Sequence, residues 1–309
     1  MNISIVIPIF NEIDSLSELK KELINNLNNF NDWEVIFVDD GSSDGSSLWL
    51  EELSKSDKHF KLIQFYRNYG KSAALNEGFK AARGDYVITM DADLQDDPAE
   101  IKNLVSKLDD GWDLVSGWKK DRLDPLNKRI PSKIFNFVTR ILTGVKIHDF
   151  NCGLKGYKQA VIKSIEIYGG RHRYIPALAG QRKFKITEIV VNHRARKFGK
   201  TKYGSSRLFH GFFDLITILF LNRFNQQPLH LFGAFGIGFF FIGFVLELIV
   251  LYYKYSIGDA FSKHIALLIF GVMLIVIGIQ FFSIGLLGEL VARPIHGKED
   301  RVRKFINNK

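Results

Sequence analysis

Acidic and amide side chains follow four short apolar runs in the first third of the chain, and they have the chemistry of a metal or phosphate site. The clusters are Asn11-Glu12, Asp39-Asp40, residues 68–71, and Asp91-Ala92-Asp93 with Gln95. Asp91, Asp93 and Gln95 offer oxygen donors at a spacing that lets them converge on one hard divalent cation, which keeps open positions for phosphate oxygens. An isolated Asp-x-Asp also occurs in solvated acidic turns. The three further clusters favour a metal site whose cation would bridge a diphosphate leaving group.

The elements around these clusters must bring them to one place. Apolar runs at 4–8, 34–38, 61–65 and 85–90 alternate with helix-compatible stretches at 14–29, 48–53 and 72–82. This alternation predicts an α/β fold of βαβ units on a mostly parallel sheet. Ligands of such sheets bind beyond the carboxyl ends of the strands, where the polar clusters fall. No Gly-x-x-x-x-Gly-Lys-Ser/Thr or Gly-x-Gly-x-x-Gly sequence follows a strand, so a P-loop kinase and a dinucleotide dehydrogenase have no support.

Cysteine and histidine contribute little to the predicted chemistry. The chain has a single cysteine, Cys152, which excludes an internal disulfide and favours a reducing compartment. No paired base for a cysteine nucleophile is identifiable, so Cys152 is interpreted as a packed small side chain. The eight histidines show no His-x-x-x-His pair and no mixed Cys/His spacing, which argues against a zinc site.

The formal net charge of +9 over 309 residues is divided into blocks. Residues 1–113 carry 22 acidic and 11 basic side chains, whereas residues 114–192 carry 5 and 16. The remaining basic excess lies in 193–228 and in the tail 292–309. This division indicates an acidic half suited to a metal and a basic half suited to phosphates, and it does not describe a nucleic-acid-binding protein.

Two apolar runs near the C-terminus predict transmembrane helices. The runs at 229–253 and 265–291 each contain one charged residue, and both exceed the ~20 residues needed to cross a bilayer. The alternative is a pair of buried core helices in a soluble domain. Because both outer flanks are strongly basic and the connector 254–264 is not, the flanks are predicted to be cytoplasmic. Met1 leads directly into a strand-like run, so no signal peptide is expected.

Basic amphipathic segments lie between the predicted sheet and the membrane spans. Within 119–133 six Lys or Arg residues precede an apolar helical face formed by positions 134, 138, 141 and 145. The face either covers a core or lies in the lipid headgroup layer, and the second reading is favoured because another candidate, 208–221, leads into the first span. The predicted organisation is a cytoplasmic catalytic domain at 1–205, an interfacial helix within 206–228, and the hairpin with its tail.

Four blocks in order carry a family resemblance: Ile7-Pro8-Ile9-Phe10-Asn11-Glu12, Val38-Asp39-Asp40-Gly41-Ser42, Arg67-Asn68-Tyr69-Gly70-Lys71, and Asp91-Ala92-Asp93-Leu94-Gln95. Together they resemble inverting family 2 glycosyltransferases with the GT-A fold. Later blocks resemble the polyprenyl-phosphate branch of that family: Gly117-Trp118-Lys119, His148-Asp149-Phe150-Asn151-Cys152-Gly153, and Arg196-Lys197-Phe198-Gly199-Lys200-Thr201-Lys202. That branch includes dolichyl-phosphate mannosyltransferases and bacterial undecaprenyl-phosphate glucosyltransferases.

The resemblance implies roles for individual residues. Asp91, Asp93 and Gln95 would ligate Mg²⁺ or Mn²⁺, and Asp149 is the candidate catalytic base, with Asp93 also catalytic through the metal. The residues implied to bind the donor are Pro8, Phe10, Asn11, Glu12, Val38, Asp40, Lys71, Asp91, Ala92, Asp93, Arg196 and Lys202. Lys119 stands where many relatives place arginine, which puts a bidentate phosphate contact there in doubt.

A phosphate acceptor changes what the catalytic groups must do. A phosphate monoester has a second pKa near 6 and is mostly anionic at neutral pH, so its difficulty is repulsion from the donor diphosphate. Lys119, Arg122 and Arg129 are predicted to hold the acceptor phosphate during one in-line displacement with inversion. Asp149 then either acts as a base, orients the acceptor or a sugar hydroxyl, or is a structural helix-capping residue.

The predicted activity is transfer of a hexose from a nucleotide-diphosphate sugar to a polyprenyl phosphate at the cytoplasmic face of the inner (cell) membrane. UDP-glucose is favoured over GDP-mannose, and undecaprenyl over dolichyl phosphate, on resemblance alone. The alternatives are a processive polysaccharide synthase, whose Gln-x-x-Arg-Trp-type motif is absent from the sequence, and a transporter component or lipid-binding scaffold. Glu247, inside the first span, is interpreted as facing a protein contact, which favours a homo-oligomer such as a tetramer.

Overall fold

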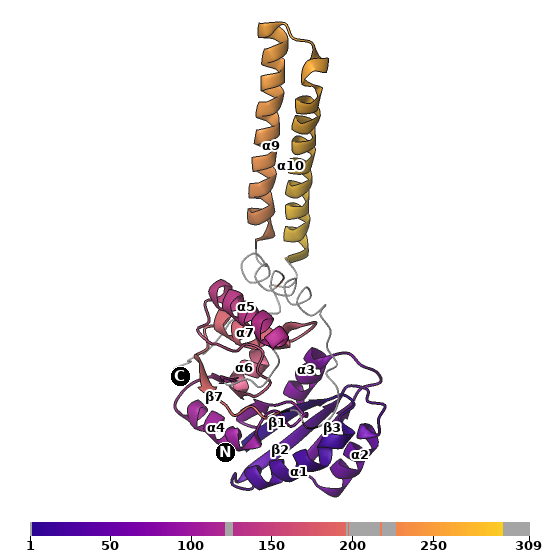
Figure 1. The fold of residues 1–309 in the computed structure, drawn as a ribbon, viewed down its shortest axis with the longest axis vertical. Helices are drawn as coiled ribbons and strands as arrows, with labels where there is room; N and C mark the ends of the chain where they lie inside the picture. Colours follow the sequence, from indigo (N-terminus) through magenta and orange to yellow (C-terminus); the bar gives the residue numbers. More distant parts are fainter. Residues whose placement is uncertain (1, 121–125, 196, 198–216, 218–226, 293–309) are drawn as a thin grey trace, which may run out of the picture. The chain divides into compact units, whose positions relative to one another are not determined.

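The structure is a computed structural model, and it describes residues 2–120, 126–195, 197, 217 and 227–292 of the chain. Two compact units are present, Met1–Ile216 and Thr217–Lys309, and each is described by itself. The first unit contains the sheet, and the second contains two long helices (Figure 1).

A seven-stranded mixed sheet with strand order β3-β2-β1-β4-β6-β5-β7 organises the first unit. The strands are β1 Asn2–Ile9, β2 Asp32–Asp39, β3 Phe60–Gln64, β4 Tyr86–Thr89, β5 Leu114–Trp118, β6 Lys155–Lys158 and β7 Ile186–Val190. Neighbouring strands are parallel except at β6, which pairs antiparallel with both β4 and β5. The predicted mostly parallel α/β sheet is therefore confirmed, and its four predicted strands lie within two residues of their expected bounds.

Helices cover both faces of this sheet. They are α1 Ile13–Leu27, α2 Ser46–Ser56, α3 Lys71–Ala81, η1 Pro98–Glu100, α4 Ile101–Asp109, α5 Leu126–Thr143, α6 Gln159–Ser164, η2 Arg171–Tyr174 and α7 Ile175–Gln181. Ile5 and Ile7 of β1 belong to one core cluster, with α1 and α4, while Val6 belongs to a second cluster, with α3, α6 and α7. Because β1 is buried on both faces, its sequence is a continuous apolar run rather than an alternating pattern.

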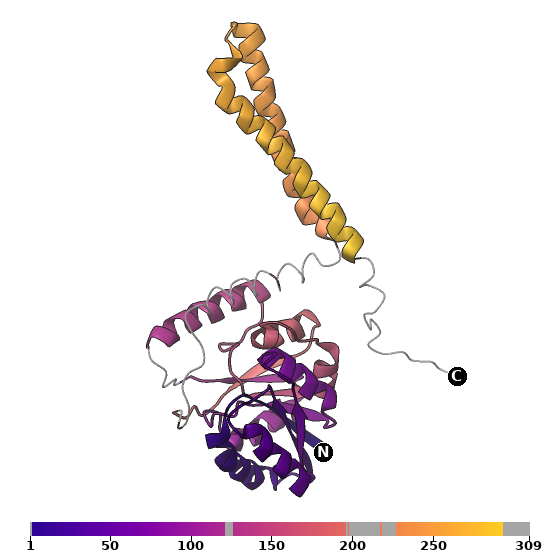
Figure 2. The same cartoon turned by 90° about the vertical axis from the view of Figure 1, so that its right-hand side faces the viewer.

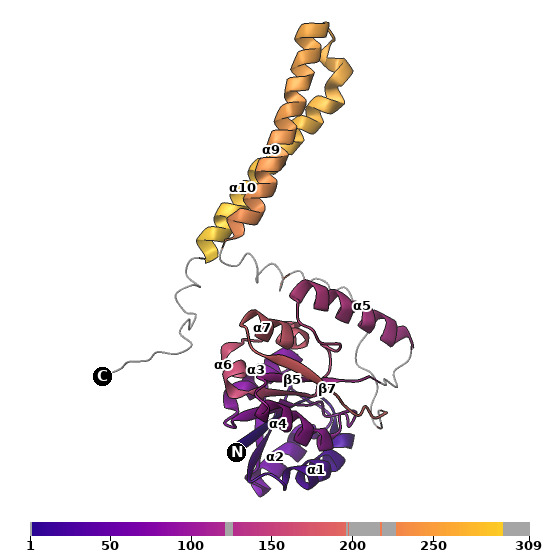
Figure 3. The same ribbon diagram turned by 90° about the vertical axis from the view of Figure 1, so that its left-hand side faces the viewer.

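Helix α5 exposes several of its apolar residues. Its inner side contains the buried Thr139 and the half-buried Phe135, whose ring packs 5.4 Å from the Tyr174 ring. Ile134 and Ile141, which the sequence pattern placed on one apolar face, are 59% and 62% exposed. An apolar face that covers a core would be buried, so the exposure of these side chains does not fit the core-covering reading. Figures 2 and 3 show α5 as a long helix at the edge of the first unit.

Two antiparallel helices form the second unit (Figures 2 and 3). Helix α9 runs over Pro228–Tyr252 and α10 over Ile265–Ala292, joined by the π-helical turn η3 Tyr253–Ile257 and the 3₁₀ turn η4 Phe261–His264. Both are long and apolar enough to cross a membrane. Little of their surface is buried inside the protein, so the alternative of two buried core helices is wrong. The helix bounds agree with the predicted spans to within one residue.

Glycines bring the backbones of this hairpin together. A Cβ atom on Gly236 would lie 2.7 Å from the Gly278 carbonyl oxygen, and one on Gly243 would lie 2.6 Å from the Gly271 carbonyl oxygen. Close backbone approach through glycine is typical of helix pairs in membranes. The Glu247 carboxylate lies against Gly271, so the residue that suggested an oligomer already has a neighbour within its own hairpin.

Three groups of predictions lie outside the described residues: Arg122 of the acceptor set, Arg196 and Lys202 of the donor set, and nearly all of the interfacial helix expected within 206–228. Residues 293–309 of the predicted tail also lie outside. Arg129 falls within α5, but its side chain is not described.

Candidate active site

The loops after β1 and β2 are tied together by side-chain hydrogen bonds. The Asn11 backbone N–H donates to Ser42 Oγ at 2.9 Å, and the Ser43 backbone N–H donates to Asn11 Oδ1 at 2.7 Å. Asn11 has a φ of 52°, a left-handed conformation that asparagine tolerates better than most residues. The predicted donor residues Pro8 and Val38 are register partners in these two strands, so the structure brings the first two motifs side by side.

Asp40 organises the third motif. Its carboxylate is buried and accepts hydrogen bonds from the backbone N–H groups of Tyr69 at 2.6 Å and Gly70 at 2.9 Å. Burial raises the pKa of Asp40 above its ordinary value, although the two N–H groups act in the opposite direction. Asp40 thus holds the start of α3, and with it Lys71, against the edge of the sheet.

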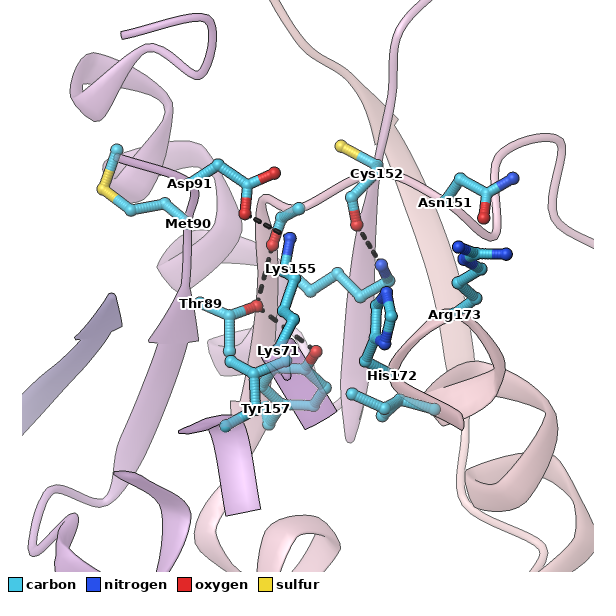
Figure 4. A pocket seen from close by; sticks show the side chains of 13 residues that line it. Lys71, Thr89, Met90, Asp91, Asn151, Cys152, Lys155, Tyr157, His172 and Arg173 are labelled. Carbon is cyan, nitrogen blue, oxygen red and sulfur yellow. Dashed lines mark hydrogen bonds and ion pairs between the residues drawn. The ribbon is translucent and has the colours of Figure 1, made fainter. Parts of the chain in front are cut away.

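Asp91 follows β4 and is held from two sides. Lys71, the first residue of α3, forms an ion pair with Asp91 (Figure 4). Burial would raise the pKa of Asp91, but the Lys71 ammonium outweighs it and holds that pKa below its ordinary range. On the other side a Cβ atom on Gly153 would lie 2.6 Å from Asp91 Oδ2, so only glycine fits there.

The predicted metal ligands lie on one short turn. Leu94 has a φ of 60°, and the Gln95 N–H donates to Asp93 Oδ1 at 3.2 Å, so the three candidate side chains belong to a tight bend after the strand. No group of three or more His, Cys, Asp and Glu side chains that could hold a metal is found in the described part of the chain. The set here is two carboxylates and the Gln95 amide, and such an all-oxygen set fits a hard cation such as Mg²⁺ or Mn²⁺.

Lys119 is placed differently from a surface phosphate ligand. Its ammonium lies 2.8 Å from Asp96 Oδ1, and the Asp96 carboxylate is fully buried and also accepts the Asp91 N–H at 3.1 Å. Burial alone would lower the pKa of Lys119, but Asp96 raises it above its ordinary value, so the lysine stays charged. The pair links the turn that follows β4 to the end of β5. Asp96 was missed by sequence reasoning because its partner lies on a distant strand.

A small polar cavity of about 20 Å³ lies behind Asp91 and contains residues that the sequence did not single out (Figure 4). Lys155 of β6 is buried and donates to the Cys152 carbonyl oxygen. Burial, together with the positive charges of Lys71 and Arg173, holds the pKa of His172 well below its ordinary value, so His172 is neutral at pH 7. No motif spacing connects Lys155 with His172. The pairing of β6 with β4 places Lys155 beside Thr89, whereas hydrogen bonds with Ser72 hold His172 of η2 against α3.

Cys152 has no role as a nucleophile here. It is buried, and burial raises the pKa of its thiol to about 12. A thiol with such a pKa is protonated at neutral pH, and the thiolate is the reactive form. The interpretation of Cys152 as a packed side chain is therefore supported.

A larger cavity of about 320 Å³ lies between α5 and the loop that precedes β6. It is lined by Trp118, Lys119, Lys120, Ser132, Lys133, Asn136, Phe137, Arg140, Ile147, His148 and Asp149. The Phe150 N–H donates to Asn136 Oδ1 at 3.2 Å, which joins the loop to α5. Four of the lining side chains are lysine or arginine, so the cavity suits an anion.

Asp149 contributes a buried carboxylate to this cavity. Its Oδ1 accepts the Asn151 N–H at 3.0 Å, and its carbonyl oxygen accepts a hydrogen bond from Ser116 Oγ at 3.2 Å. Because Asp149 lies in the loop between α5 and β6, the helix-capping alternative is wrong. Its place among cations agrees with a role in catalysis or in orienting a substrate.

Solved structures share the fold of the first unit. Glucosyl-3-phosphoglycerate synthase from Mycobacterium tuberculosis, solved in complex with Mn²⁺ and uridine-diphosphate-glucose, superposes with a TM-score of 0.55 at 18% identity, over 72% of this chain and 78% of that chain. The same synthase in complex with phosphoglyceric acid gives a TM-score of 0.54. The first unit therefore has the GT-A fold of nucleotide-sugar transferases, as the sequence predicted.

The chain belongs to glycosyl transferase family 2, whose profile it matches over residues 4–166. It is 36% identical to the dodecaprenyl-phosphate galacturonate synthase of Rhizobium johnstonii, over 99% of this chain and 92% of that protein. It is 35% identical to the undecaprenyl-phosphate 4-deoxy-4-formamido-L-arabinose transferase of Salmonella choleraesuis, over 98% and 92%. Both similarities extend through the two C-terminal helices.

Proposed function

We propose that the protein transfers a sugar from a nucleotide-diphosphate sugar to a polyprenyl phosphate, releasing the nucleoside diphosphate. The observation that carries the proposal is the cationic cavity beside Asp149, which adjoins the strand-end site through the Asp96–Lys119 ion pair. One site suits a donor diphosphate and the other an anionic acceptor. Two relatives that match the chain over nearly its full length are named for polyprenyl-phosphate products, which supports the lipid acceptor.

The donor sugar is proposed as a class. The two relatives are named for galacturonate and 4-deoxy-4-formamido-L-arabinose, and neither is a neutral hexose. The fold neighbour was solved with uridine-diphosphate-glucose, but at 18% identity it supports the fold alone. UDP-glucose and GDP-mannose remain candidate donors beside these two modified sugars.

In the proposed reaction an oxygen of the acceptor phosphate attacks the anomeric carbon as the bond from that carbon to the diphosphate breaks, with inversion. Asp91, Asp93 and Gln95 would hold Mg²⁺ or Mn²⁺, which supplies positive charge to the leaving diphosphate. Asp40 and Lys71 position the donor edge of the site. Because the acceptor oxygen is already anionic, Asp149 serves to orient the acceptor or a sugar hydroxyl if it does not act as a base.

Two ion pairs of Arg194 hold the segment that precedes Arg196 against α1 and the loop before η1. The Arg194 guanidinium lies 2.8 Å from Glu22 Oε2 on α1 and 2.7 Å from Asp97 Oδ1 beside η1. The implied diphosphate ligands Arg196 and Lys202 come directly after this anchor. We propose that they bind the donor diphosphate.

The proposed acceptor is a membrane lipid, and the chain carries matching surfaces. The hairpin of α9 and α10 is apolar enough to span a bilayer, and α5 exposes Ile134, Phe137 and Ile141 beside the cationic cavity. We place the catalytic unit on the cytoplasmic side of the cell membrane, where nucleotide sugars occur and where the positive-inside rule puts the basic flanks.

The proposal is tested with the purified full chain in detergent, undecaprenyl phosphate, Mg²⁺ or Mn²⁺, and a panel of radiolabelled nucleotide sugars. We expect label to enter the organic phase as a single lipid-linked sugar with one of the donors. Label in a polymer would instead identify a processive synthase. No transfer from any donor of the panel, while nucleotide still binds, would favour a scaffold and overturn the proposal.

A further inference from the structure

His148 lies at the cationic cavity in a geometry that fixes the orientation of its ring. The ring stacks on Trp118 with centroids 4.2 Å apart and planes 14° apart. The His148 backbone N–H donates to Glu188 Oε2 at 2.6 Å, and ring Nδ1 contacts Glu188 Oε1. The carboxylate accepts the Nδ1–H, which leaves Nε2 as the ring's second polar atom.

Cationic side chains surround His148 in the cavity. The cavity that it lines also contains Lys120, which follows β5, and Lys133 and Arg140 from α5. The acidic groups near it are Glu188 on β7, which its ring and backbone contact, and Asp149, the next residue in the chain. His148 is half exposed although its Nδ1 side is held, so the ring is accessible to a ligand in the cavity.

We propose that His148 binds the phosphate of the acceptor through Nε2 and positions its attacking oxygen. This inference rests on the proposed lipid-phosphate acceptor. A phosphate oxygen that carries negative charge accepts a hydrogen bond from an imidazole N–H, and such charge-assisted hydrogen bonds are the stronger ones. When Nε2 carries a proton, one N–H···O hydrogen bond therefore forms between the ring and the acceptor phosphate.

The proton balance of the step follows directly. The proton stays on Nε2, an unprotonated phosphate oxygen forms the new bond to the anomeric carbon, and the nucleoside diphosphate leaves with the electron pair of the broken bond. Glu188 accepts the Nδ1–H and so holds the ring in place. The hydrogen bond from Nε2 orients the acceptor phosphate, so that an unprotonated oxygen of the same phosphate is positioned for attack.

The chain supplies its own matched control. His59 stacks on Trp33 with ring centroids 4.4 Å apart, and its Nδ1 lies 2.9 Å from Asp57 Oδ1. Its backbone N–H also donates to Asp57 Oδ1, at 3.0 Å. The same set of contacts thus occurs at the amino end of β3, away from the cationic cavity. If substitution of His148 weakens ligand binding and substitution of His59 does not, the effect comes from the cavity and not from the general loss of a stacked histidine.

The experiment measures binding of citronellyl phosphate, a short polyprenyl phosphate, to the full chain in detergent, with the alcohol citronellol as the probe that lacks phosphate. We compare wild type with His148→Phe, which keeps a stacking ring, with His148→Gln, which restores a hydrogen-bond donor, and with His59→Phe. His148→Phe should weaken citronellyl phosphate binding about tenfold, the effect of one charge-assisted hydrogen bond. His148→Gln should recover most of this loss, and His59→Phe should bind as wild type does.

Binding of UDP or GDP, whichever the wild type binds, distinguishes a local role of His148 at the cavity from a general structural role. Unchanged nucleotide affinity in His148→Phe supports the proposal. Wild-type binding of citronellyl phosphate by His148→Phe, an equal loss in His59→Phe, or a parallel loss of nucleotide affinity would each overturn it. If wild type binds citronellyl phosphate no better than citronellol, both this inference and the lipid-phosphate acceptor are wrong. Phosphate-dependent binding without sugar transfer would contradict the proposed function alone.

Discussion

At the residue scale, one carboxylate connects the two halves of the site. Asp91 is paired with Lys71 on its donor side and faces Gly153, which belongs to the loop that also carries Asp149. A change in the position of Asp91 would therefore affect both the proposed donor edge and the loop that carries Asp149. We expect substitutions on the turn after β4 to reduce nucleotide binding as well as turnover.

Substitution of Asp93 tests the metal site. Asp93→Asn removes a charged oxygen from the proposed ligand set, so we expect turnover in Mg²⁺ or Mn²⁺ to fall at least 100-fold while the protein stays folded. The assay is lipid-linked label formed per unit time across a metal titration, with Asp110→Asn as the control, because Asp110 is an exposed partner of Lys107. Full wild-type activity in the presence of a chelator would contradict the metal reading.

Substitution of Asp149 separates binding from chemistry. Asp149→Asn keeps the side-chain oxygen that accepts the Asn151 N–H, so the loop should keep its conformation. We expect nucleotide affinity near that of wild type and a kcat reduced about 100-fold, which is the lower range for loss of a catalytic carboxylate. Nucleotide binding is measured by calorimetry and kcat by lipid-linked label. A kcat close to wild type would remove Asp149 from the catalytic groups.

At the element scale, Glu34 joins three segments of the sheet. This residue of β2 accepts a hydrogen bond from Ser4 Oγ on β1 at 2.6 Å, pairs with Lys61 on β3, and accepts the Arg83 N–H at 2.9 Å. Burial would raise the pKa of Glu34, but these partners, Lys61 foremost, lower it overall. The ionised carboxylate is therefore part of what holds the parallel strands in register.

The lowered pKa of Glu34 gives a pH-dependent prediction. Because the folded-state pKa lies below the unfolded value of about 4.3, the stabilisation is present above that value and is lost as the pH falls through the folded-state pKa. Glu34→Gln should lower the free energy of unfolding at pH 7 by about 1–2 kcal/mol, with a smaller difference below about pH 4. Tryptophan-fluorescence melts across pH measure this effect. Glu51→Gln, at an exposed pair, should have no effect, and a pH-independent difference for Glu34→Gln would contradict the assignment.

At the scale of the whole molecule, the chain consists of an α/β catalytic unit and a helical hairpin whose energetics differ. The first unit buries two apolar clusters on either side of a sheet. The hairpin buries little and leaves most of its apolar surface for a lipid environment. Within a bilayer the attraction between its helices must come from close packing rather than from removal of apolar surface from water.

Two glycines of the hairpin make that packing testable. Gly278→Ala would place its Cβ 2.7 Å from the Gly236 carbonyl oxygen, whereas Gly238→Ala meets nothing within 4 Å. We expect Gly278→Ala to destabilise the hairpin by about 1–3 kcal/mol, as overpacking does, and Gly238→Ala to be neutral or slightly stabilising. Helical circular dichroism during thermal unfolding in detergent is the measurement. Equal melting of the two variants would show that the glycine contacts do not hold the hairpin.

Features that depend on local pattern could be predicted from the sequence alone. The alternation of strand and helix patterns and the two long apolar runs involve residues that are close in the chain, so the α/β unit and the hairpin could be predicted. The predicted stretch 48–53 is shorter than α2, because the serines at both ends of the helix add nothing to the apolar pattern.

Only the tertiary structure decided which distant residues meet. The antiparallel insertion of β6 between β4 and β5 places Lys155 and Gly153 beside Asp91, and the pairing of β5 with β7 brings Glu188 to His148. The exposure of Ile134 and Ile141 on α5 could likewise not be predicted, because an apolar helical face has the same period whether it is buried or exposed. Contacts between residues far apart in the chain depend on strand order and packing, which no local pattern encodes, and the cationic cavity is built from such contacts.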